Sequence, residues 1–169
     1  MQNIAEFEFV SKSRFEEDAA KAFDADEIQI SEAYEALKIP ARATKGSAGY
    51  DFYCPFDIEL EAGESILIPT GIRVRMDEGW VLLLFPRSGL GFKYRFQLDN
   101  SVGVIDQDYY HADNEGHIMA RMTNDSREGK TLSLKAGKAF MQGVFVPFGI
   151  ADATQVTAQR TGGFGSTTE

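Results

Sequence analysis

The sequence predicts an all-β fold, either a β-barrel or a jelly roll. After Pro40, short alternating or apolar segments follow one another closely, and glycine-containing turns separate them. This pattern is typical of antiparallel strands in a closed or two-sheet architecture. The chain has 169 residues, of which 43% are hydrophobic, so it is long enough to bury one core. We therefore expect one barrel domain over residues 1–158, followed by a flexible glycine-rich tail over residues 159–169.

The first quarter of the chain differs from the rest. Ala5–Val10 alternates apolar and polar residues, which predicts a half-buried strand. Residues 11–37 are rich in acidic side chains, with apolar residues at helical spacing, so we expect a helical insertion there. Ser31 is a good N-cap and would start a second helix with Tyr34 and Leu37 on one face. The acidic face is interpreted as a solvated surface or, alternatively, as a contact surface for a protein partner.

The later strands are predicted from alternation and from apolar runs between turns. They are Ser65–Ile72, Arg73–Met76, Trp80–Phe85, Thr131–Leu134 and Phe140–Phe148. Trp80–Phe85 is apolar almost throughout, which is typical of a strand buried on both faces. These segments account for the barrel that the overall pattern predicts.

Charge and cysteine content exclude several classes of function. The net charge is -9, which argues against nucleic-acid binding, because a phosphate backbone attracts an excess of lysine and arginine. Cys54 is the only cysteine, so an intrachain disulfide and a cysteine-rich zinc site are excluded, and we expect a small buried strand residue there. No stretch has the pattern of a signal peptide or of a membrane-spanning helix. The composition therefore predicts a cytoplasmic protein without a membrane partner.

Asn100–Tyr109 is the first candidate for a functional site. Valine and isoleucine residues around Gly103 lead to one carboxylate, Asp106, which would act as a general base in a substrate pocket. The same residues also fit a hairpin or bulge in which the acidic side chain only forms a turn. The choice between a catalytic carboxylate and a turn residue therefore depends on other parts of the chain.

Three other segments place functional side chains among glycines: one carries a carboxylate, and two carry side chains suited to an anionic ligand. One places Asp51 after glycine and tyrosine, and another joins Arg87 and Ser88 to a glycine amide. Near the end of the chain, Arg160 and Phe164 lie among glycines and hydroxyls, a combination that can fold over an anionic, planar ligand. Taken singly, each segment also fits a plain turn or a disordered tail.

Together, the segments resemble the five motifs of the homotrimeric dUTP pyrophosphatase (dUTPase) family. In chain order the matching stretches are AGYD, PRSGL, NSVGVIDQDY, the apolar strand that contains Gln142, and GGFGST. The resemblance covers about Lys38 to Thr167, and only the N-terminal helical region lies outside it. It implies a distorted jelly-roll barrel that hydrolyses dUTP to dUMP and pyrophosphate, which keeps uracil out of DNA and supplies dUMP for thymidylate synthesis.

The resemblance also implies roles for individual residues. Tyr109 would pack on the deoxyribose and exclude a 2′-hydroxyl, and Asp106 would deprotonate the attacking water. The residues implied in the uracil pocket are Asn100, Gly103, Val104 and Ile105. The residues implied at the phosphates or over the base, with Phe164 stacking on uracil, are Arg87, Ser88, Gly89, Gln142, Arg160, Phe164, Gly165, Ser166 and Thr167.

A cofactor and an assembly follow from the same resemblance. Mg²⁺ chelated by the phosphates would neutralise the leaving pyrophosphate, and Asp51 would hold this ion, through water. Three copies would share three active sites, with each tail lying over a site on another copy. dUTP is therefore the expected substrate, in a homotrimer.

The sequence departs from the family pattern in its fourth and fifth motifs. Ala139 stands where an arginine usually precedes the glutamine, and Lys138 is the nearest replacement. Only three residues separate Arg160 from Phe164, so the fifth motif is shortened. We expect the phosphate-binding part of the site to differ most from the family.

Residues 110–115 lengthen the connection after Tyr109. The histidine in this stretch, His111, is expected to be exposed to solvent, and so is His117. Neither histidine is assigned a role in the site.

Two other functions remain open at the level of sequence. A dCTP deaminase-type enzyme of the same fold would release ammonia instead of pyrophosphate. A regulatory protein-binding module would use the scaffold for contacts made by the acidic residues 11–37. The products formed from deoxynucleoside triphosphates distinguish the first of these from a dUTPase.

Overall fold

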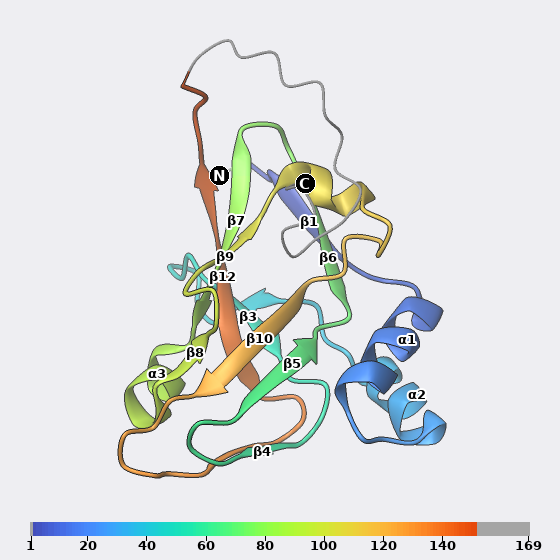
Figure 1. Ribbon diagram of the computed structural model, residues 1–169. Helices are drawn as coiled ribbons and strands as arrows, with labels where there is room; N and C mark the ends of the chain where they lie inside the picture. The colour runs from blue at the N-terminus through green and yellow to red at the C-terminus, as the bar shows by residue number, and fades with distance from the viewer. Residues whose placement is uncertain (1, 152–169) are drawn as a thin grey trace.

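Antiparallel strands form most of the structure, and two N-terminal helices pack against one side of them (Figure 1). The computed structural model describes residues 2–151. The strands are β1 Ala5–Phe9, β2 Ala41–Arg42, β3 Tyr50–Tyr53, β4 Ile58–Leu60, β5 Ser65–Pro69, β6 Ile72–Met76, β7 Trp80–Pro86, β8 Phe96–Leu98, β9 Gly103–Ile105, β10 Met119–Asn124, β11 Leu132–Leu134 and β12 Ala139–Pro147. The α-helices are α1 Lys12–Ala22, α2 Glu27–Glu35 and α3 Ser88–Tyr94, and η1 Gln107–His111 is a 3-10 helix.

The strands of the described residues form four antiparallel sheets. The largest has the order β2-β3-β12-β7-β9, and β5-β10-β8 forms the second. Two pairs, β1-β6 and β11-β4, complete the set. Most paired strands are distant in the sequence, as in jelly rolls and Greek-key barrels, so the predicted all-β fold is confirmed.

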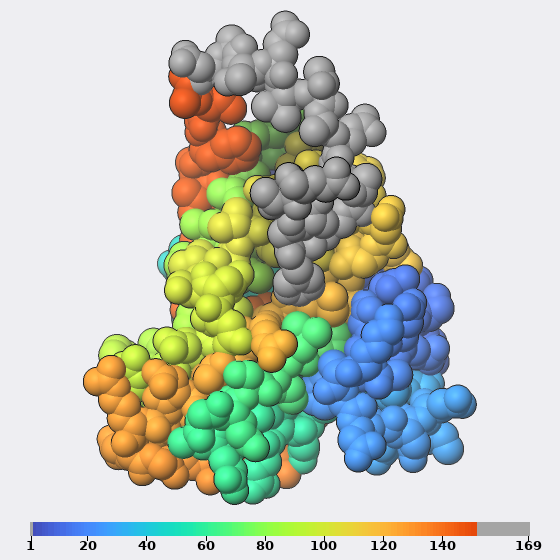
Figure 2. Space-filling model, viewed as in Figure 1, coloured from blue at the N-terminus to red at the C-terminus, as the bar shows by residue number. Residues whose placement is uncertain are grey.

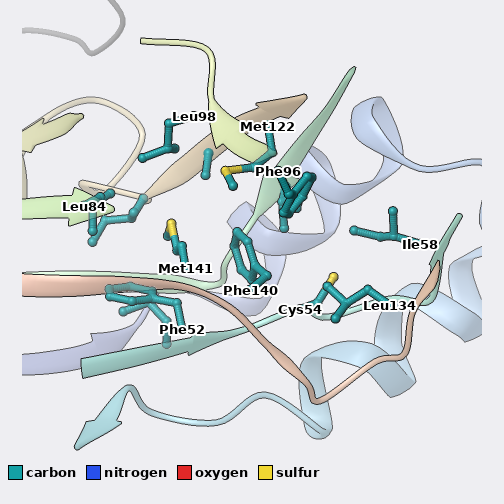
Figure 3. Packing of buried hydrophobic residues seen from close by; sticks show 14 of the residues in the cluster. Phe52, Cys54, Ile58, Leu84, Phe96, Leu98, Met122, Leu134, Phe140 and Met141 are labelled. Carbon is teal, nitrogen blue, oxygen red and sulfur yellow. The ribbon is translucent and has the colours of Figure 1, made fainter. Parts of the chain in front are cut away.

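The core lies between these sheets and is apolar. Figure 3 shows Phe52 of β3 and Phe140 and Met141 of β12 packed side by side within it. Cys54 belongs to this core and is 1% exposed, and its burial raises the pKa of the thiol to about 12. The prediction of a small buried cysteine is therefore confirmed, although Cys54 lies just after β3 and not within a strand.

β7 differs from the strand that the sequence predicts. Leu82 and Leu84 are buried, whereas Val81, Leu83 and Phe85 are partly exposed. The prediction of burial on both faces is wrong for this chain, because only one face of β7 packs on the core. An apolar run alone does not reveal whether one or both faces are covered.

The N-terminal capping residues determine where α1 and α2 begin. Ser11 caps α1, and its side chain accepts a hydrogen bond from the Arg14 N–H. α2 begins after Asp26 and not at Ser31, as the sequence analysis expected. Asp26 and Gln29 form a reciprocal capping box, which satisfies two backbone donors and outcompetes the later serine.

A second, smaller core attaches the helices to the barrel. Its buried members are Val10, Phe15, Ala19, Ile30 and Ala33. The Phe15 ring is fully buried, with its centroid 6.3 Å from that of Phe56 in the barrel. Figure 2 shows the result as a lobe of blue helices on the flank of the molecule.

Candidate active site

A pocket of about 400 Å³ opens beside β9, where this strand runs along β7. Half of its lining belongs to the segment that the sequence singles out. These residues are Asn100, Val102, Gly103, Val104, Ile105 and Tyr109. The structure therefore brings the four residues expected at the base, together with Tyr109, around one cavity of a size suited to a small ligand.

Gly103 allows β9 to approach β7 closely. A side-chain carbon at this position would lie 3.0 Å from the Leu84 Cβ and 3.1 Å from its Cδ1. The strands on either side of this segment are not paired with each other, because β8 pairs with β10 and β9 pairs with β7. Residues 99–102 instead form a turn between two sheets, which exposes backbone groups beside the pocket.

Asp106 follows β9 directly and is the N-cap residue of η1. Its backbone is extended, with φ -77° and ψ 157°, and its side chain makes no capping hydrogen bond to the helix. The residue is half-buried. In the sequence it lies between two pocket-lining residues, Ile105 and Tyr109, although it is not itself among the residues that line the cavity.

Tyr109 forms one wall of the pocket and is only 7% exposed. Its hydroxyl donates a hydrogen bond to the His117 carbonyl at 2.9 Å. The same hydroxyl accepts a hydrogen bond from the Asn114 side-chain amide at 2.8 Å. Both ends of the phenol are therefore fixed, the ring by its burial and the hydroxyl by the turn that follows η1.

His117 is fully buried, so the prediction of an exposed histidine is wrong. Its Nε2 accepts a hydrogen bond from the Gly71 N–H at 2.8 Å, and its Nδ1 lies 2.7 Å from Asp18 Oδ2. Because an N–H can only donate, the ring hydrogen is on Nδ1 and is donated to Asp18. The position of His117 directly before Ile118 and an alternating strand was the one sequence signal for burial. His111, by contrast, is exposed, as predicted.

Asp18 is the acidic partner that the sequence analysis missed. The residue is 7% exposed, and Arg14 Nη1 lies 3.4 Å from its Oδ1. Burial opposes the charge on Asp18, but the hydrogen bond from His117 and the nearby cationic groups outweigh it, and the pKa is lowered from 3.8. Asp18 is therefore ionised at neutral pH.

A second group of predicted residues meets at the other side of β7. Asp51 of β3 and Gln142 of β12 are opposite each other in register, and Arg87 Nε lies 3.3 Å from Asp51 Oδ1. The Gln142 amide donates to the Pro86 carbonyl at 3.3 Å. A side chain at Gly49 would place its Cβ 2.5 Å from Gln142 Oε1, so the glycine of the first motif makes room for the glutamine of the fourth.

Along β7, Asp106 and Arg87 lie toward opposite ends of the strand. Ile105 pairs with Leu82, so continuing the same register places Asp106 opposite Val81. Val81 is six residues before Arg87. At about 3.3 Å per strand residue, the backbones of Asp106 and Arg87 are roughly 20 Å apart. Within a single copy of the chain, the side chains of Asp106 and Arg87 are therefore too far apart to contact each other.

The residues around Arg87 differ from the family pattern as the sequence indicates. Ser88 and Gly89 are the first residues of α3, directly after Arg87. Lys138 and Ala139 line the same shallow hollow as Arg87. Ala139 thus stands at the position of the family arginine, and the lysine beside it, Lys138, carries the nearest replacement charge.

The pocket also contains a pair of charges that the sequence analysis missed. Asp99 and Arg121 both line it, and Arg121 Nε lies 3.1 Å from Asp99 Oδ2. Arg121 belongs to the alternating strand β10, where its polar side chain resembles any solvent-facing residue. Only the pairing of β10 with β5 and β8 reveals that it borders the cavity.

Some expectations fall outside the part of the chain that the structure describes. These are the assignments of Arg160, Phe164, Gly165, Ser166 and Thr167. Within residues 2–151, no three histidine, cysteine, aspartate or glutamate side chains gather as a metal site would need. Over the same residues, none of the helices has the length and apolar character needed to cross a membrane.

The dUTPase family profile matches residues 35–168. The chain belongs to the dUTPase family. A deoxyuridine 5′-triphosphate nucleotidohydrolase of Lactococcus lactis subsp. lactis is 45% identical over 134 residues, which cover 78% of this chain and 88% of the relative. The corresponding protein of Paraburkholderia phymatum is 37% identical over 149 residues, covering 83% and 96% of the two chains. The profile begins at the end of α2, so α1 and most of α2 lie outside the family match.

Solved structures of dUTPases agree with this assignment. The crystal structure of the dUTPase from Streptococcus mutans aligns with a TM-score of 0.64 at 38% identity, covering 87% of this chain and 98% of that one. A dUTPase from phage phi11 of S. aureus aligns with a TM-score of 0.64 at 22% identity and supports the fold alone. The barrel described above is therefore the dUTPase fold.

Proposed function

We propose that this chain hydrolyses dUTP to dUMP and pyrophosphate at a site formed around the β9 pocket. The observation that supports this best is a cavity lined by Asn100, Gly103 and Tyr109, with Asp106 directly after the pocket-lining strand β9. Membership of the dUTPase family assigns the same chemistry. The dUMP produced serves thymidylate synthesis, and removal of dUTP keeps uracil out of DNA.

The pocket side of the site selects the nucleoside and activates water. Backbone groups from Asn100 to Ile105 pair with the edge of the uracil ring, and the narrow cavity leaves no room for a larger base. The Tyr109 ring packs on the deoxyribose where a 2′-hydroxyl would otherwise lie. Asp106 accepts a proton from the water that attacks the α-phosphorus, and the bond to the bridging oxygen of pyrophosphate breaks. A positioned base of this kind contributes about 10²–10⁴-fold in rate.

The phosphate side comes from a different copy of the chain. Asp51, Arg87 and Gln142 form one group, but Asp106 lies roughly 20 Å away along β7. A heterologous interface in a homotrimer would place the β9 pocket of one copy against the Arg87 group of the next. Ser88 and Gly89 adjoin this group, and we assign Arg160, Phe164, Gly165, Ser166 and Thr167 to closure over the bound nucleotide.

Magnesium fits this site as an ion that arrives with the triphosphate. Asp51 is a single carboxylate already paired with Arg87, and the described residues hold no cluster of three potential ligands. Such a donor set suits Mg²⁺, which is held mainly by phosphate oxygens and water. When bound, the ion neutralises charge on the leaving pyrophosphate. A structure of a mutant phage phi11 dUTPase reveals the coordination of a structural Mg(II) ion in that protein.

The decisive experiment is incubation of the purified chain with each deoxynucleoside triphosphate and Mg²⁺, with pyrophosphate, ammonia and nucleotide products measured together. We expect pyrophosphate and dUMP from dUTP alone. Asp106→Asn should bind dUTP and lose about 10²-fold or more in kcat, because the amide does not accept the proton from water. Wild-type turnover by Asp106→Asn would remove Asp106 from the mechanism.

The alternatives predict other products. Ammonia released from dCTP would identify a deaminase of the same fold and refute the proposed hydrolysis. A role of the helices in binding a protein partner remains a separate prediction. A groove between α1 and α2 that is lined by Glu16, Glu27, Ile28 and Glu32 is the place where such a partner would bind.

A further inference from the structure

The segment that follows Tyr109 is tied to the N-terminal part of the chain at three points. Glu8 Oε2 accepts a hydrogen bond from the Tyr110 hydroxyl at 2.9 Å. Glu115 accepts hydrogen bonds from both the N–H and the hydroxyl of Ser11, at 2.8 and 2.6 Å. The third point is the buried contact of 2.7 Å between His117 and Asp18 described above. Figure 2 shows the blue N-terminal helices packed against the gold segment that contains these residues.

These contacts surround the groups that hold the Tyr109 hydroxyl. Asn114 donates to that hydroxyl, and the His117 carbonyl accepts from it. Two residues of the turn are held by the N-terminal part of the chain and are called anchors: Glu115, which contacts Ser11, and His117, which contacts Asp18. Asn114 lies directly before the first anchor, and the carbonyl that accepts from Tyr109 belongs to the second. Movement of either anchor changes the position of an atom that touches Tyr109.

The turn between the two anchors contains a residue in an unfavourable backbone conformation. Glu115 has φ +61°, a left-handed conformation that costs a non-glycine residue free energy. Gly116 follows with φ +70°, and a Cβ there would lie 2.7 Å from the Tyr109 carbonyl oxygen. The two hydrogen bonds from Ser11 offset the strain at Glu115, and they keep the turn against η1.

The contact at Glu8 is itself part of a small network. Arg73 donates to Glu8 Oε2 from Nε at 3.1 Å and from Nη2 at 2.8 Å. The Arg73 guanidinium also lies 4.5 Å from the centroid of the Tyr110 ring. Tyr110, adjacent to Tyr109 in η1, is thus fixed between β1 and β6.

We infer that residues 8–18, which carry the N-terminal partners of these contacts, are a positioning element for Tyr109 and thereby set the discrimination between deoxyribose and ribose. This inference rests on the proposed function, in which Tyr109 excludes a 2′-hydroxyl. Asp18 and Glu115 touch no substrate. They act through the 114–117 turn, which sets how closely the Tyr109 ring approaches the sugar.

The test compares kcat/KM for dUTP and UTP in Asp18→Ala and Glu115→Ala. Each variant loses one anchoring contact, so the ratio of the two kcat/KM values should fall by about three- to tenfold, through a higher KM for dUTP and gained activity on UTP. kcat for dUTP should stay within about twofold of wild type, because Asp106 is not altered. Asp18→Asn, which keeps an acceptor oxygen for His117, should restore most of the discrimination.

The ratio separates positioning from simple support of the fold. A loss of folded protein lowers the rates for both substrates equally and leaves the ratio unchanged. Glu17→Ala is the matched control, because it removes an exposed α1 carboxylate that pairs with Arg14 and Lys21 on the same helix. Glu115 lies on a surface turn, so Glu115→Ala carries the test if Asp18→Ala fails to fold.

Tyr109→Ala shows which proposal fails. If it relaxes discrimination while Glu115→Ala and the folded Asp18→Ala keep the wild-type ratio, the coupling is refuted and the role of Tyr109 stands. If all three keep the wild-type ratio while dUTP is still hydrolysed, both the coupling and the sugar role of Tyr109 are refuted, and the hydrolytic function stands.

Discussion

At the scale of single residues, two glycines leave the space that neighbouring residues of the site occupy. Gly49 leaves room for Gln142, and Gly103 lets β9 lie close to Leu84. Neither position needs glycine for its backbone conformation, because neither has a positive φ. Their common property is the absence of a side chain where another residue approaches, so each is a packing requirement of the site.

Replacement of Gly103 tests this packing requirement. Gly103→Ala places a methyl group 3.0 Å from the Leu84 Cβ, so β9 must shift and the pocket must change shape. We expect a loss of about 1–3 kcal/mol in the free energy of unfolding, as for other overpacked positions, together with a raised KM for dUTP. Urea denaturation and steady-state kinetics measure the two effects.

Gly46→Ala is the control for this change, because a Cβ at Gly46 meets nothing within 4 Å. The double variant Gly103→Ala with Leu84→Ala should recover part of the KM, since it removes the close approaches to Leu84 Cδ1 and Cγ, at 3.1 and 3.3 Å, while the approach to Cβ stays. A KM for Gly103→Ala equal to that of wild type would contradict the close approach as a requirement of the pocket.

The sequence predicted residues in motifs better than residues between them. Tyr109 and Gly103 line one pocket, and Asp106 directly follows the pocket-lining strand β9, because each lies in a short segment whose own pattern places it beside a strand. His117 was predicted to be exposed, since its partners are 99 residues away in α1 and 46 residues away at Gly71. Contacts of such long sequence separation leave no local pattern.

At the scale of elements, about half of the strands could be predicted, whereas β2, β4, β8 and β10 and the attachment of the helices could not. Alternation and glycine turns gave β1, β5, β6 and β12 close to their observed bounds. The capping box at Asp26 was also present in the sequence, but Ser31 was preferred to it. The link between α1 and the turn after η1 required the structure, because it depends on how the helices pack on the barrel.

Two carboxylates of this attachment make it sensitive to acid. The pKa of Glu115 is lowered by its hydrogen bonds from the Ser11 hydroxyl and N–H, and that of Asp18 is lowered by His117 and nearby cationic groups despite its burial. A carboxyl group whose pKa is lowered in the folded state stabilises that state above its unfolded pKa, and the stabilisation is lost as pH falls through the folded pKa.

The double variant Asp18→Asn with Glu115→Gln tests this dependence. At pH 7 it should be less stable than wild type by about 1–3 kcal/mol in the free energy of unfolding. The difference should shrink as the pH falls below about 4, where the wild-type carboxylates become protonated. Urea denaturation from pH 7 to pH 3 measures it, with Glu32→Gln on the exposed face of α2 as the control. A difference that stays constant over this range would contradict the assigned ionisation.

At the scale of the whole molecule, the arrangement of the site along β7 bears on how many copies are needed. Asp106 lies between β9 and η1 toward one end of β7, while Arg87, the residue before α3, follows the other end; Figure 1 shows α3 at that end. The roughly 20 Å between them follows from the strand register and the rise per residue. The Asp106 and Arg87 side chains therefore do not contact each other within one copy, which leaves open whether one copy or two form the site. The sequence order of the motifs gives no hint of this separation, because it arises only from the pairing of β7 with β9.

Mixing of two inactive variants tests the shared site directly. Asp106→Asn and Arg87→Ala each disable one half, so each protein alone should have little activity on dUTP. The two variants are mixed in equal amounts, mildly denatured and refolded together. A site formed by two copies is then intact when the Arg87→Ala copy provides the pocket with its unaltered Asp106, and the Asp106→Asn copy provides the phosphate side with its unaltered Arg87. Random assembly gives this combination in about a quarter of the sites, so we expect about a quarter of the wild-type rate. The double variant refolded alone is the control for the procedure and should stay inactive. A site contained within one chain predicts no recovery in the mixture, because every copy then carries one damaged half.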